Sequence, residues 1–193
     1  NAFCNIEQDL KYGGENELIF VNDGSTDASM NILEVIAQQN KNVRVISFSR
    51  NFGHEAAMIA GIDHAAGDVI ICMDADLQHP LECIAPIMAK FEEGYEVISM
   101  VRTSNKSAGA IKNFTSRAFY RVINALSDQV KLEENASDFF AISSRVADVL
   151  RTNYREKTRF LRGYVQSVGF RKTTLEYTAA ERAGGASHHT LKN

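Results

Sequence analysis

Three oxygen-bearing side chains stand two residues apart where an apolar segment of the chain ends. Asp74, Asp76 and Gln78 follow the run VIICM, and Pro80 closes the stretch. Side chains of an extended segment alternate between two sides, so these three would lie on the same side. Carboxylate and amide oxygens suit hard cations such as Mg²⁺ or Mn²⁺, which commonly take one or two carboxylates plus substrate phosphates. The spacing therefore favours a divalent-metal site, although a cap or a turn would use the same residue types.

The two carboxylates are costly at this spacing unless a cation neutralises them. Like charges so close repel each other, and one of the two would otherwise hold a proton. A D-x-D motif alone is common by chance, so its position at the end of a buried strand carries the interpretation. Ligands of open α/β sheets bind beyond the carboxyl ends of parallel strands. We therefore expect Asp74 and Asp76 at the ligand-binding edge of a sheet.

A second acidic motif, VNDGSTD at residues 21–27, has the same placement after a predicted strand. Asp23 would point out of the strand end, where its carboxylate can accept hydrogen bonds from a nucleobase or a ribose. One of the polar residues at 25–27 can cap the helix that follows. Taken alone, the motif is equally that of a tight turn and a helix cap, which needs no ligand.

A basic stretch after residue 101 is suited to an anionic ligand. Its basic residues are Arg102, Lys106, Lys112, Arg117 and Arg121. Arg117 and Arg121 are four positions apart and would share one face of a helix. Arginine binds phosphate with a forked geometry, so a phosphate group would fit here. A surface helix with its arginines in water is an equal interpretation.

Asp138, in the segment SDFF, is a further carboxylate at a predicted strand. A carboxylate can act as a base for a hydroxyl within hydrogen-bond reach, or it can orient an arginine. A cap at the start of a strand is the interpretation that needs no ligand. The histidines are expected to be surface, packing or turn residues, with support of the metal motif as an alternative for His79.

The first half of the chain alternates predicted strands and helices. Strands are expected at 17–22, 43–49, 68–74 and 95–101, and helices at 27–40, 54–67 and 81–94. Apolar and β-branched runs indicate the strands, and helical spacing of apolar residues indicates the helices. This alternation is typical of βαβ units around a parallel sheet with helices on both faces.

The second half departs from this alternation. Helices are expected at 110–127, 145–154 and 158–168, and strands at 137–143 and 169–178, the last as an edge or antiparallel strand. The chain opens in what resembles a loop entering a helix, so we expect an opening strand to be missing. We predict one α/β catalytic domain over residues 1–178, followed by a mobile tail over residues 179–193.

Composition and charge narrow the class of protein. The 193 residues are 45% hydrophobic and 23% charged, which suits an ordinary globular domain. Residues 1–100 carry 16 acidic and 5 basic side chains, and residues 101–193 carry 8 and 16. Nucleic acid is disfavoured as a partner, because the acidic half offsets the basic one. Three cysteines without a C-x-x-C pair favour reduced thiols and a cytoplasmic setting.

Taken together, these motifs resemble a family 2 glycosyltransferase of the GT-A fold. The segments that carry the resemblance are VNDGSTD, RNFGHEAAMIAGIDHAAGDVIICMDADLQHP, SRAFYRVIN, SDFF, RFLRG and ERAGGAS. They cover nearly the whole chain in the family's order. Within the family the chain is most similar to the polyprenyl-phosphate glycosyltransferases, which include dolichyl-phosphate mannosyltransferase. The resemblance implies an α/β, Rossmann-like domain with a mainly parallel central sheet and inverting transfer of a hexose.

The resemblance also implies roles for single residues. Those at the nucleotide sugar would be Asp23, Arg50, Asn51, Gly53 and Asp74. Those that hold Mg²⁺ or Mn²⁺ against the diphosphate would be Asp74, Asp76 and Gln78. Arg102 and Arg117 match basic positions near the diphosphate and the acceptor phosphate, and Arg121 would join Arg117 at the acceptor. Asp138 is the carboxylate that we expect near the acceptor. A sugar hydroxyl must give its proton to a base within hydrogen-bond reach, whereas a lipid phosphate is already ionised near neutral pH. Asp138 would thus be either a base or a group that orients an arginine or the donor sugar. Arg182 and Ser187 match a loop that closes over the site.

The implied partners are a UDP- or GDP-sugar donor, a lipid-phosphate acceptor and the cytoplasmic face of a membrane, and a homo-oligomer is compatible with them. The chain has Asn22-Asp23 where the family often has two aspartates, and Leu81 where proline is commoner. These departures leave the base selectivity and the membrane anchoring open. The rival within transferases is a soluble enzyme that extends a polysaccharide with Asp138 as base.

Two other classes fit the sequence less well. A phosphoaspartate hydrolase would carry its acidic motif on the first strand, whereas Asp74 and Asp76 follow a later one. A non-catalytic module that binds sugar nucleotides would have lost the metal carboxylates, which are present.

Overall fold

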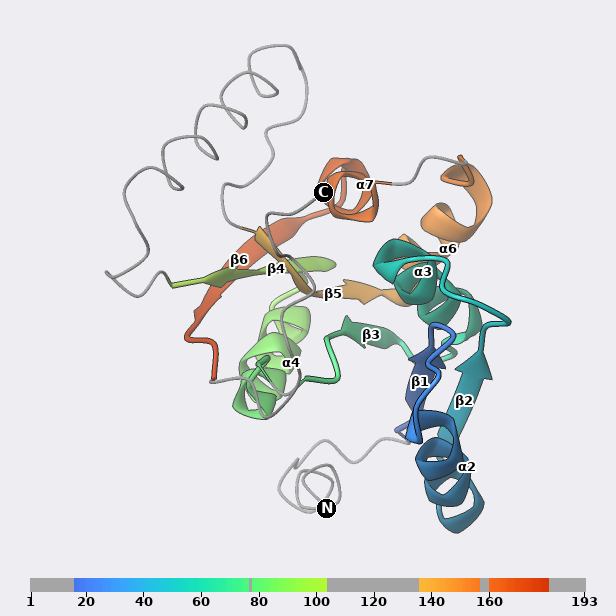
Figure 1. The fold of residues 1–193 in the computed structure, drawn as a ribbon. Coiled ribbons are helices and arrows are strands. Elements are labelled where there is room, and N and C mark those ends of the chain that lie inside the picture. The colour runs from blue at the N-terminus through green and yellow to red at the C-terminus, as the bar shows by residue number, and fades with distance from the viewer. Residues whose placement is uncertain (1–15, 77, 104–135, 157–159, 181–193) are drawn as a thin grey trace, which may run out of the picture.

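The computed structural model describes residues 16–76, 78–103, 136–156 and 160–180. The strands are β1 (Leu18–Asn22), β2 (Val43–Ser47), β3 (Val69–Cys72), β4 (Val97–Arg102), β5 (Ala136–Ser143) and β6 (Lys172–Tyr177). The helices are α2 (Ser29–Gln39), α3 (His54–His64), α4 (Ile84–Glu92), α6 (Ser144–Asn153) and α7 (Leu161–Ser167), with a short 3₁₀ turn, η1 (Leu81–Cys83). Strands and helices alternate through the first half, as predicted (Figure 1).

The strands form two sheets in the described part of the chain. β1 and β2 pair in parallel, and the other four follow the order β3-β5-β4-β6. β5 runs antiparallel to both of its neighbours, whereas β4 and β6 are parallel. The α/β class is confirmed. In the larger sheet β3, β4 and β6 run in one direction, and only the inserted β5 runs opposite to them. The predicted edge strand at 169–178 lies at the sheet edge as β6 and pairs in parallel.

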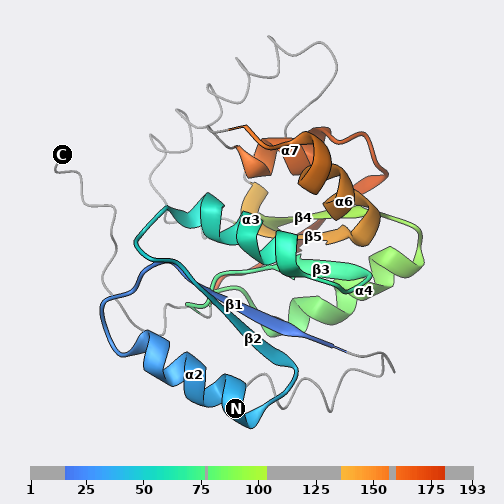
Figure 2. The same ribbon diagram turned by 90° about the vertical axis from the view of Figure 1, so that its right-hand side faces the viewer.

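Helices cover both faces of the larger sheet. α3, α6 and α7 lie on one face and α4 lies on the other (Figures 1 and 2). Side chains of β5 divide between the two layers because they alternate along the strand. Phe140 and Ile142 pack with α3, α6 and α7, whereas Phe139 and Ala141 pack with α4. Since both faces of β5 are buried at its centre, residues 139–142 form an apolar run that carries no sign of the strand's direction.

Local chemistry accounts for the helix that contains a proline. Pro86 is the third residue of α4, where a backbone N–H has no partner within the helix. The missing donor of the proline therefore costs nothing at this position. Among the helices of the described ranges, none is long and apolar enough to cross a membrane.

Candidate active site

Two carboxylates from neighbouring strands meet at one edge of the larger sheet. The antiparallel register pairs Cys72 of β3 with Phe140 of β5. Continued by two residues, the same register would place Asp74 opposite Asp138. Like charges directly opposite each other destabilise a sheet, so a group that can offset them is expected between them. Asp138 also shares its side of β5 with Phe140 and Ile142, which face α3 and α7.

That group is the imidazole of His54, the first residue of α3. Its Nε2 lies 3.6 Å from Oδ1 of Asp74 and 3.6 Å from Oδ2 of Asp138. The side chain is 49% exposed, so it faces both the acids and solvent. His54 was not predicted as a site residue, because a histidine at a helix start is typical of a surface residue. The available signal was its place just after RNFG, at the edge where ligands bind.

A guanidinium group holds the other oxygen of Asp138. Arg162 of α7 donates two hydrogen bonds to Oδ1 of Asp138, at 3.1 Å from Nε and 2.7 Å from Nη2. Sequence analysis missed this arginine, although it belongs to the quoted segment RFLRG. Asp138 thus has one oxygen on Arg162 and the other facing His54.

His79 contacts both the backbone and the carboxylate of Asp74. Its side chain is only 7% exposed, and its ring stacks on Phe139 at 4.8 Å between centroids. Nδ1 accepts the backbone N–H of Asp74 at 2.9 Å, and Nε2 lies 3.8 Å from Oδ2 of the same residue. Burial lowers the pKa of His79, although the nearby carboxylates, Asp74 first, oppose this. A neutral ring therefore carries its proton on Nε2, facing Asp74. For His79, this geometry favours support of the metal motif over a simple turn residue.

The remaining residues of the metal motif form a turn. Oδ1 of Asp76 accepts the backbone N–H of Gln78 at 3.0 Å, and the carbonyl of Gln78 accepts the N–H of Ala180 at 3.1 Å. In the described ranges no three histidine, cysteine, aspartate or glutamate side chains converge as a ready-made metal site. Mg²⁺ is often bound by one or two carboxylates plus substrate phosphates, which Asp74 and Asp76 can provide. The donor set therefore fits a cation that arrives with a diphosphate.

Four of the five residues predicted for the nucleotide sugar, all except Asp74, come together after the end of β1. Asp23 accepts the N–H groups of Phe52 and Gly53, at 2.7 and 2.9 Å. Gly24 has a φ of 69°, and a Cβ there would lie 2.4 Å from the carbonyl carbon of Arg50. The backbone of the RNFG segment therefore packs directly on the turn after β1. Asp23 also satisfies N–H groups at the start of α3, where negative charge is favourable.

The turn predicted at 21–27 is present, and the motif also bonds the start of α2. Asn22 forms the turn by accepting the N–H of Ser25, and Asp27 accepts the N–H of Ser29 at the start of α2. Asp23 lies within that turn, but its side chain bonds the RNFG segment instead.

Beside this contact lies an exposed cation–aromatic pair. The guanidinium of Arg50 lies 4.1 Å from the ring centroid of Phe52, which is 51% exposed. Phe48 meets the same ring edge-on at 5.5 Å. Asn51, which the sequence also assigned to the nucleotide, is exposed next to them.

Other predicted residues are not brought to the carboxylates. Arg102 ends β4 and is exposed, and in the described part of the chain no hydrogen bond or ion pair joins it to Asp74 or Asp138. Six predicted residues, the helix at 110–127 and residues 181–193 of the tail lie outside the described residues. The six are Lys106, Lys112, Arg117, Arg121, Arg182 and Ser187.

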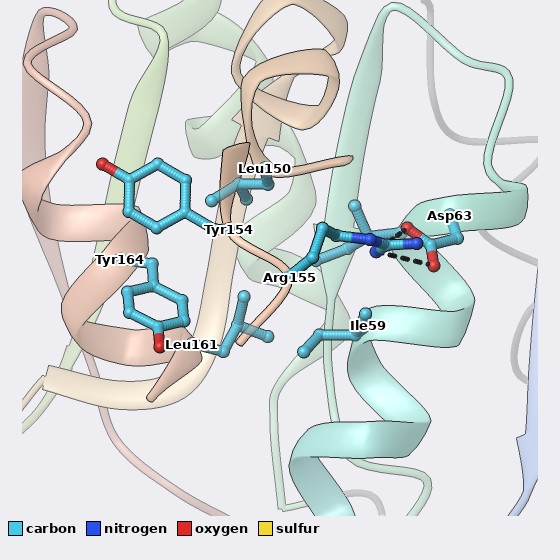
Figure 3. A pocket seen from close by; sticks show the side chains of 8 residues that line it. Ile59, Asp63, Leu150, Tyr154, Arg155, Leu161 and Tyr164 are labelled. Atoms are coloured by element: carbon cyan, nitrogen blue, oxygen red, sulfur yellow. Dashed lines mark hydrogen bonds and ion pairs between the residues drawn. The ribbon is translucent and has the colours of Figure 1, made fainter. Parts of the chain in front are cut away.

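A small pocket between α3, α6 and α7 is separate from this site. Figure 3 shows its lining, which includes Ile59, Leu161 and the ion pair between Arg155 and Asp63, at 3.0 Å. None of the predicted site residues lines it. The candidate site is therefore the acidic sheet edge rather than this pocket.

Comparison with known proteins agrees with the class that the fold and site indicate. The family model described as Glycosyl transferase family 2 matches residues 4–151. The chain is 42% identical over 176 residues to the uncharacterized glycosyltransferase YkcC of Bacillus subtilis (strain 168), covering 91% of this chain and 54% of that protein. It is 38% identical over 173 residues to the bactoprenol glucosyl transferase of Shigella phage SfV, covering 90% and 56%.

The chain therefore belongs to glycosyl transferase family 2, as the quoted segments predicted, and its domain is that of a transferase. It spans about half the length of the curated relatives that it matches.

Solved structures show the same fold. The mannosyltransferase PcManGT from Pyrobaculum calidifontis, in complex with GDP-Man and Mn²⁺, superposes with a TM-score of 0.55 at 16% identity, covering 87% of this chain and 48% of that one. S. aureus TarS 1-349 gives the same TM-score at 16% identity, covering 84% and 50%. The GT-A fold that the resemblance implied is confirmed.

Proposed function

We propose that this domain transfers a hexose from a nucleotide diphosphate sugar to a polyprenyl phosphate, with inversion and with a divalent cation. The observation that carries the proposal is the meeting of Asp74 and Asp138, from two strands, around the Nε2 of His54. It joins the acidic motif predicted for the donor to the carboxylate predicted for the acceptor. The relatives named bactoprenol glucosyl transferase support the polyprenyl acceptor.

The donor nucleotide would lie over the turn after β1. Asp23 keeps the RNFG segment in place, and its oxygens remain acceptors for a base or a ribose hydroxyl. The exposed ring of Phe52, with Arg50 beside it, offers a surface on which a nucleobase can stack. A nucleotide in this place would have its diphosphate directed toward the end of β3.

Asp74 and Asp76 would hold the cation, with Gln78 as the third predicted ligand. A bound Mg²⁺ or Mn²⁺ would neutralise the charge that develops on the leaving diphosphate. Nδ1 of His79 accepts the backbone N–H of Asp74. This hydrogen bond holds the backbone of Asp74, so the carboxylate of Asp74 is kept at a set position. Two adjacent carboxylates without a cation would repel each other, which is why we expect transfer to depend on the metal.

The acceptor determines the role of Asp138. A lipid phosphate is already ionised and attacks without a base, so Asp138 would orient groups around it rather than take a proton. Its ion pair with Arg162 supports this role, because one oxygen is held at a fixed place. Arg102, Arg117 and Arg121 are the further cations that we propose for the acceptor phosphate. Inversion would follow from a single in-line displacement at the anomeric carbon.

A comparison of two acceptors, each supplied separately, tests the proposal. The chain is incubated with radiolabelled UDP- or GDP-hexose and Mn²⁺, and with either a polyprenyl phosphate or an oligosaccharide. We expect the lipid acceptor to be labelled, as a hexosyl lipid in the organic phase, and the oligosaccharide to remain unlabelled. Label on the oligosaccharide instead would favour the rival enzyme that uses Asp138 as base. If neither acceptor is labelled with any donor, the proposed function fails.

A further inference from the structure

One imidazole nitrogen serves two carboxylates that the proposed reaction uses for different purposes. Nε2 of His54 is equally far, at 3.6 Å, from an oxygen of Asp74 and from an oxygen of Asp138. Ionised carboxylate oxygens only accept hydrogen bonds, so Nε2 must carry a proton to face both of them. This holds whether the ring is neutral or charged.

A single N–H cannot donate well to two acceptors at once. At 3.6 Å both distances exceed the usual range of an N–H···O bond, so a small movement toward one acid makes that bond and loses the other. The ring has room for this movement because its side chain is 49% exposed. The backbone beneath it is fixed, since Asp23 holds the preceding Gly53 at 2.9 Å.

The two acids differ in their other contacts. Asp138 is already held at Oδ1 by Arg162, and only its Oδ2 faces His54. Asp74 is held through its backbone by His79, and its two carboxylate oxygens face the two histidines, at 3.6 and 3.8 Å. A cation on Asp74 would compete with His54 for the same oxygens.

We propose that His54 is a positioning residue that couples loading of the donor site to the orientation of Asp138. This inference rests on the proposed function. While Asp74 is without a cation, His54 divides its N–H between the two acids. Once Asp74 is engaged as a ligand, the N–H of His54 turns to Oδ2 of Asp138. Both oxygens of Asp138 are then held, one by Arg162 and one by His54, when the donor is in place.

Substitution of His54 separates this role from direct metal binding and from a structural one. In His54→Ala, Asp74 loses a competing donor, so Mn²⁺ measured by electron paramagnetic resonance with a nucleoside diphosphate should bind at least twofold more tightly. The kcat for transfer should fall about tenfold or more, since Asp138 is held on one side only. His54→Gln places an N–H at similar reach and should restore both values most of the way. His64→Ala, at the other end of α3, should change neither.

Each outcome of these measurements either supports the inference or overturns it. Mn²⁺ binding that is unchanged or weaker in His54→Ala overturns the inference, because His54 would then not compete for Asp74. A wild-type kcat in that variant overturns it as well. A melting temperature equal to that of the wild type shows that the variant is folded. If the wild-type chain transfers no sugar, the proposed function fails, and the Mn²⁺ measurement still decides whether His54 competes for Asp74.

Discussion

Arg162 and Asp138 form a two-point contact in which both nitrogens bind the same oxygen, at 3.1 and 2.7 Å. The pair joins α7 to β5 and leaves the second oxygen of Asp138 facing His54. Both side chains are about one-third exposed, at 31% and 33%. An ion pair with this exposure adds little to the stability of the fold, so its main effect is to orient Asp138.

Replacing Arg162 by lysine tests this orientation. Lysine keeps the charge but loses the planar fork, so Asp138 would no longer be held through two nitrogens. We expect kcat/KM to fall by roughly 10- to 100-fold and the free energy of unfolding by less than about 1 kcal/mol. Arg155→Lys is the matched control, because Arg155 pairs with Asp63 at the separate pocket in Figure 3. Equal transfer rates in the two variants would show that the fork has no role.

Gly24 should tolerate no side chain. Its φ of 69° is unfavourable for alanine by about 1–2 kcal/mol. A Cβ would also lie 2.4 Å from the carbonyl carbon of Arg50, so the RNFG segment would have to move. We expect Gly24→Ala to lose more than about 2 kcal/mol in urea unfolding and to weaken nucleotide binding.

Gly67→Ala is the control for Gly24, since a Cβ there would meet its nearest atom at an ordinary 3.4 Å. We expect it to change the unfolding free energy by less than about 0.5 kcal/mol. Similar losses in the two variants would contradict the close packing of the turn on the RNFG segment.

Asp76→Asn should abolish transfer without unfolding the chain. The amide oxygen of asparagine can still accept the N–H of Gln78, so the turn is kept while the charge is lost. Excess EDTA should have the same effect on the wild type, and added Mn²⁺ should reverse it. Asp68→Asn, just before the opposite end of β3, is the control and should transfer normally. Near-normal turnover in Asp76→Asn, measured with radiolabelled donor, would refute the metal role.

The thiol of Cys72 should be unreactive in the folded protein. Burial raises its pKa from 9.0 to about 12, so almost no thiolate is present at pH 8. Iodoacetamide followed by peptide mapping should modify Cys72 far more slowly in buffer than in urea. Equal rates in the two conditions would show that β3 opens readily at its end.

The same shift predicts a dependence of stability on pH. The unfolded chain releases the Cys72 proton near pH 9, whereas the folded chain keeps it until about pH 12. Stability should therefore fall as pH rises through this window. Titration of the unfolding free energy should show a smaller fall in Cys72→Ala than in the wild type. Identical slopes would contradict the shift.

The elements were predictable where local pattern decides them. The expected strand at 43–49 and helix at 27–40 correspond to Val43–Ser47 and Ser29–Gln39, because β-branched runs and helical spacing are properties of the segment itself. The helix expected from residue 81 begins as a 3₁₀ turn, Leu81–Cys83, before α4. Ends of elements depend on caps and tertiary contacts, which pattern does not contain.

Strand direction and side-chain partners could not be predicted in this way. Residues 139–142 of β5 are apolar on both faces, so nothing in them shows that the strand runs antiparallel between β3 and β4. That insertion is what brings Asp138 beside Asp74. His54 and Arg162 are 108 positions apart, so no local pattern links them. They become part of one site only because this strand pairing brings Asp74 and Asp138 together. The acidic motif itself could be predicted, because its spacing and its place after a strand are properties of one short segment.

The central claim is that the carboxylates at this sheet edge hold a cation against the diphosphate of the donor. Crystals grown with Mn²⁺ and a nucleoside diphosphate, measured at the manganese absorption edge, test it most directly. The claim predicts an anomalous peak within about 2.3 Å of oxygens of Asp74 or Asp76, and of the diphosphate. A peak bound elsewhere, with both acids turned away from the nucleotide, would contradict it.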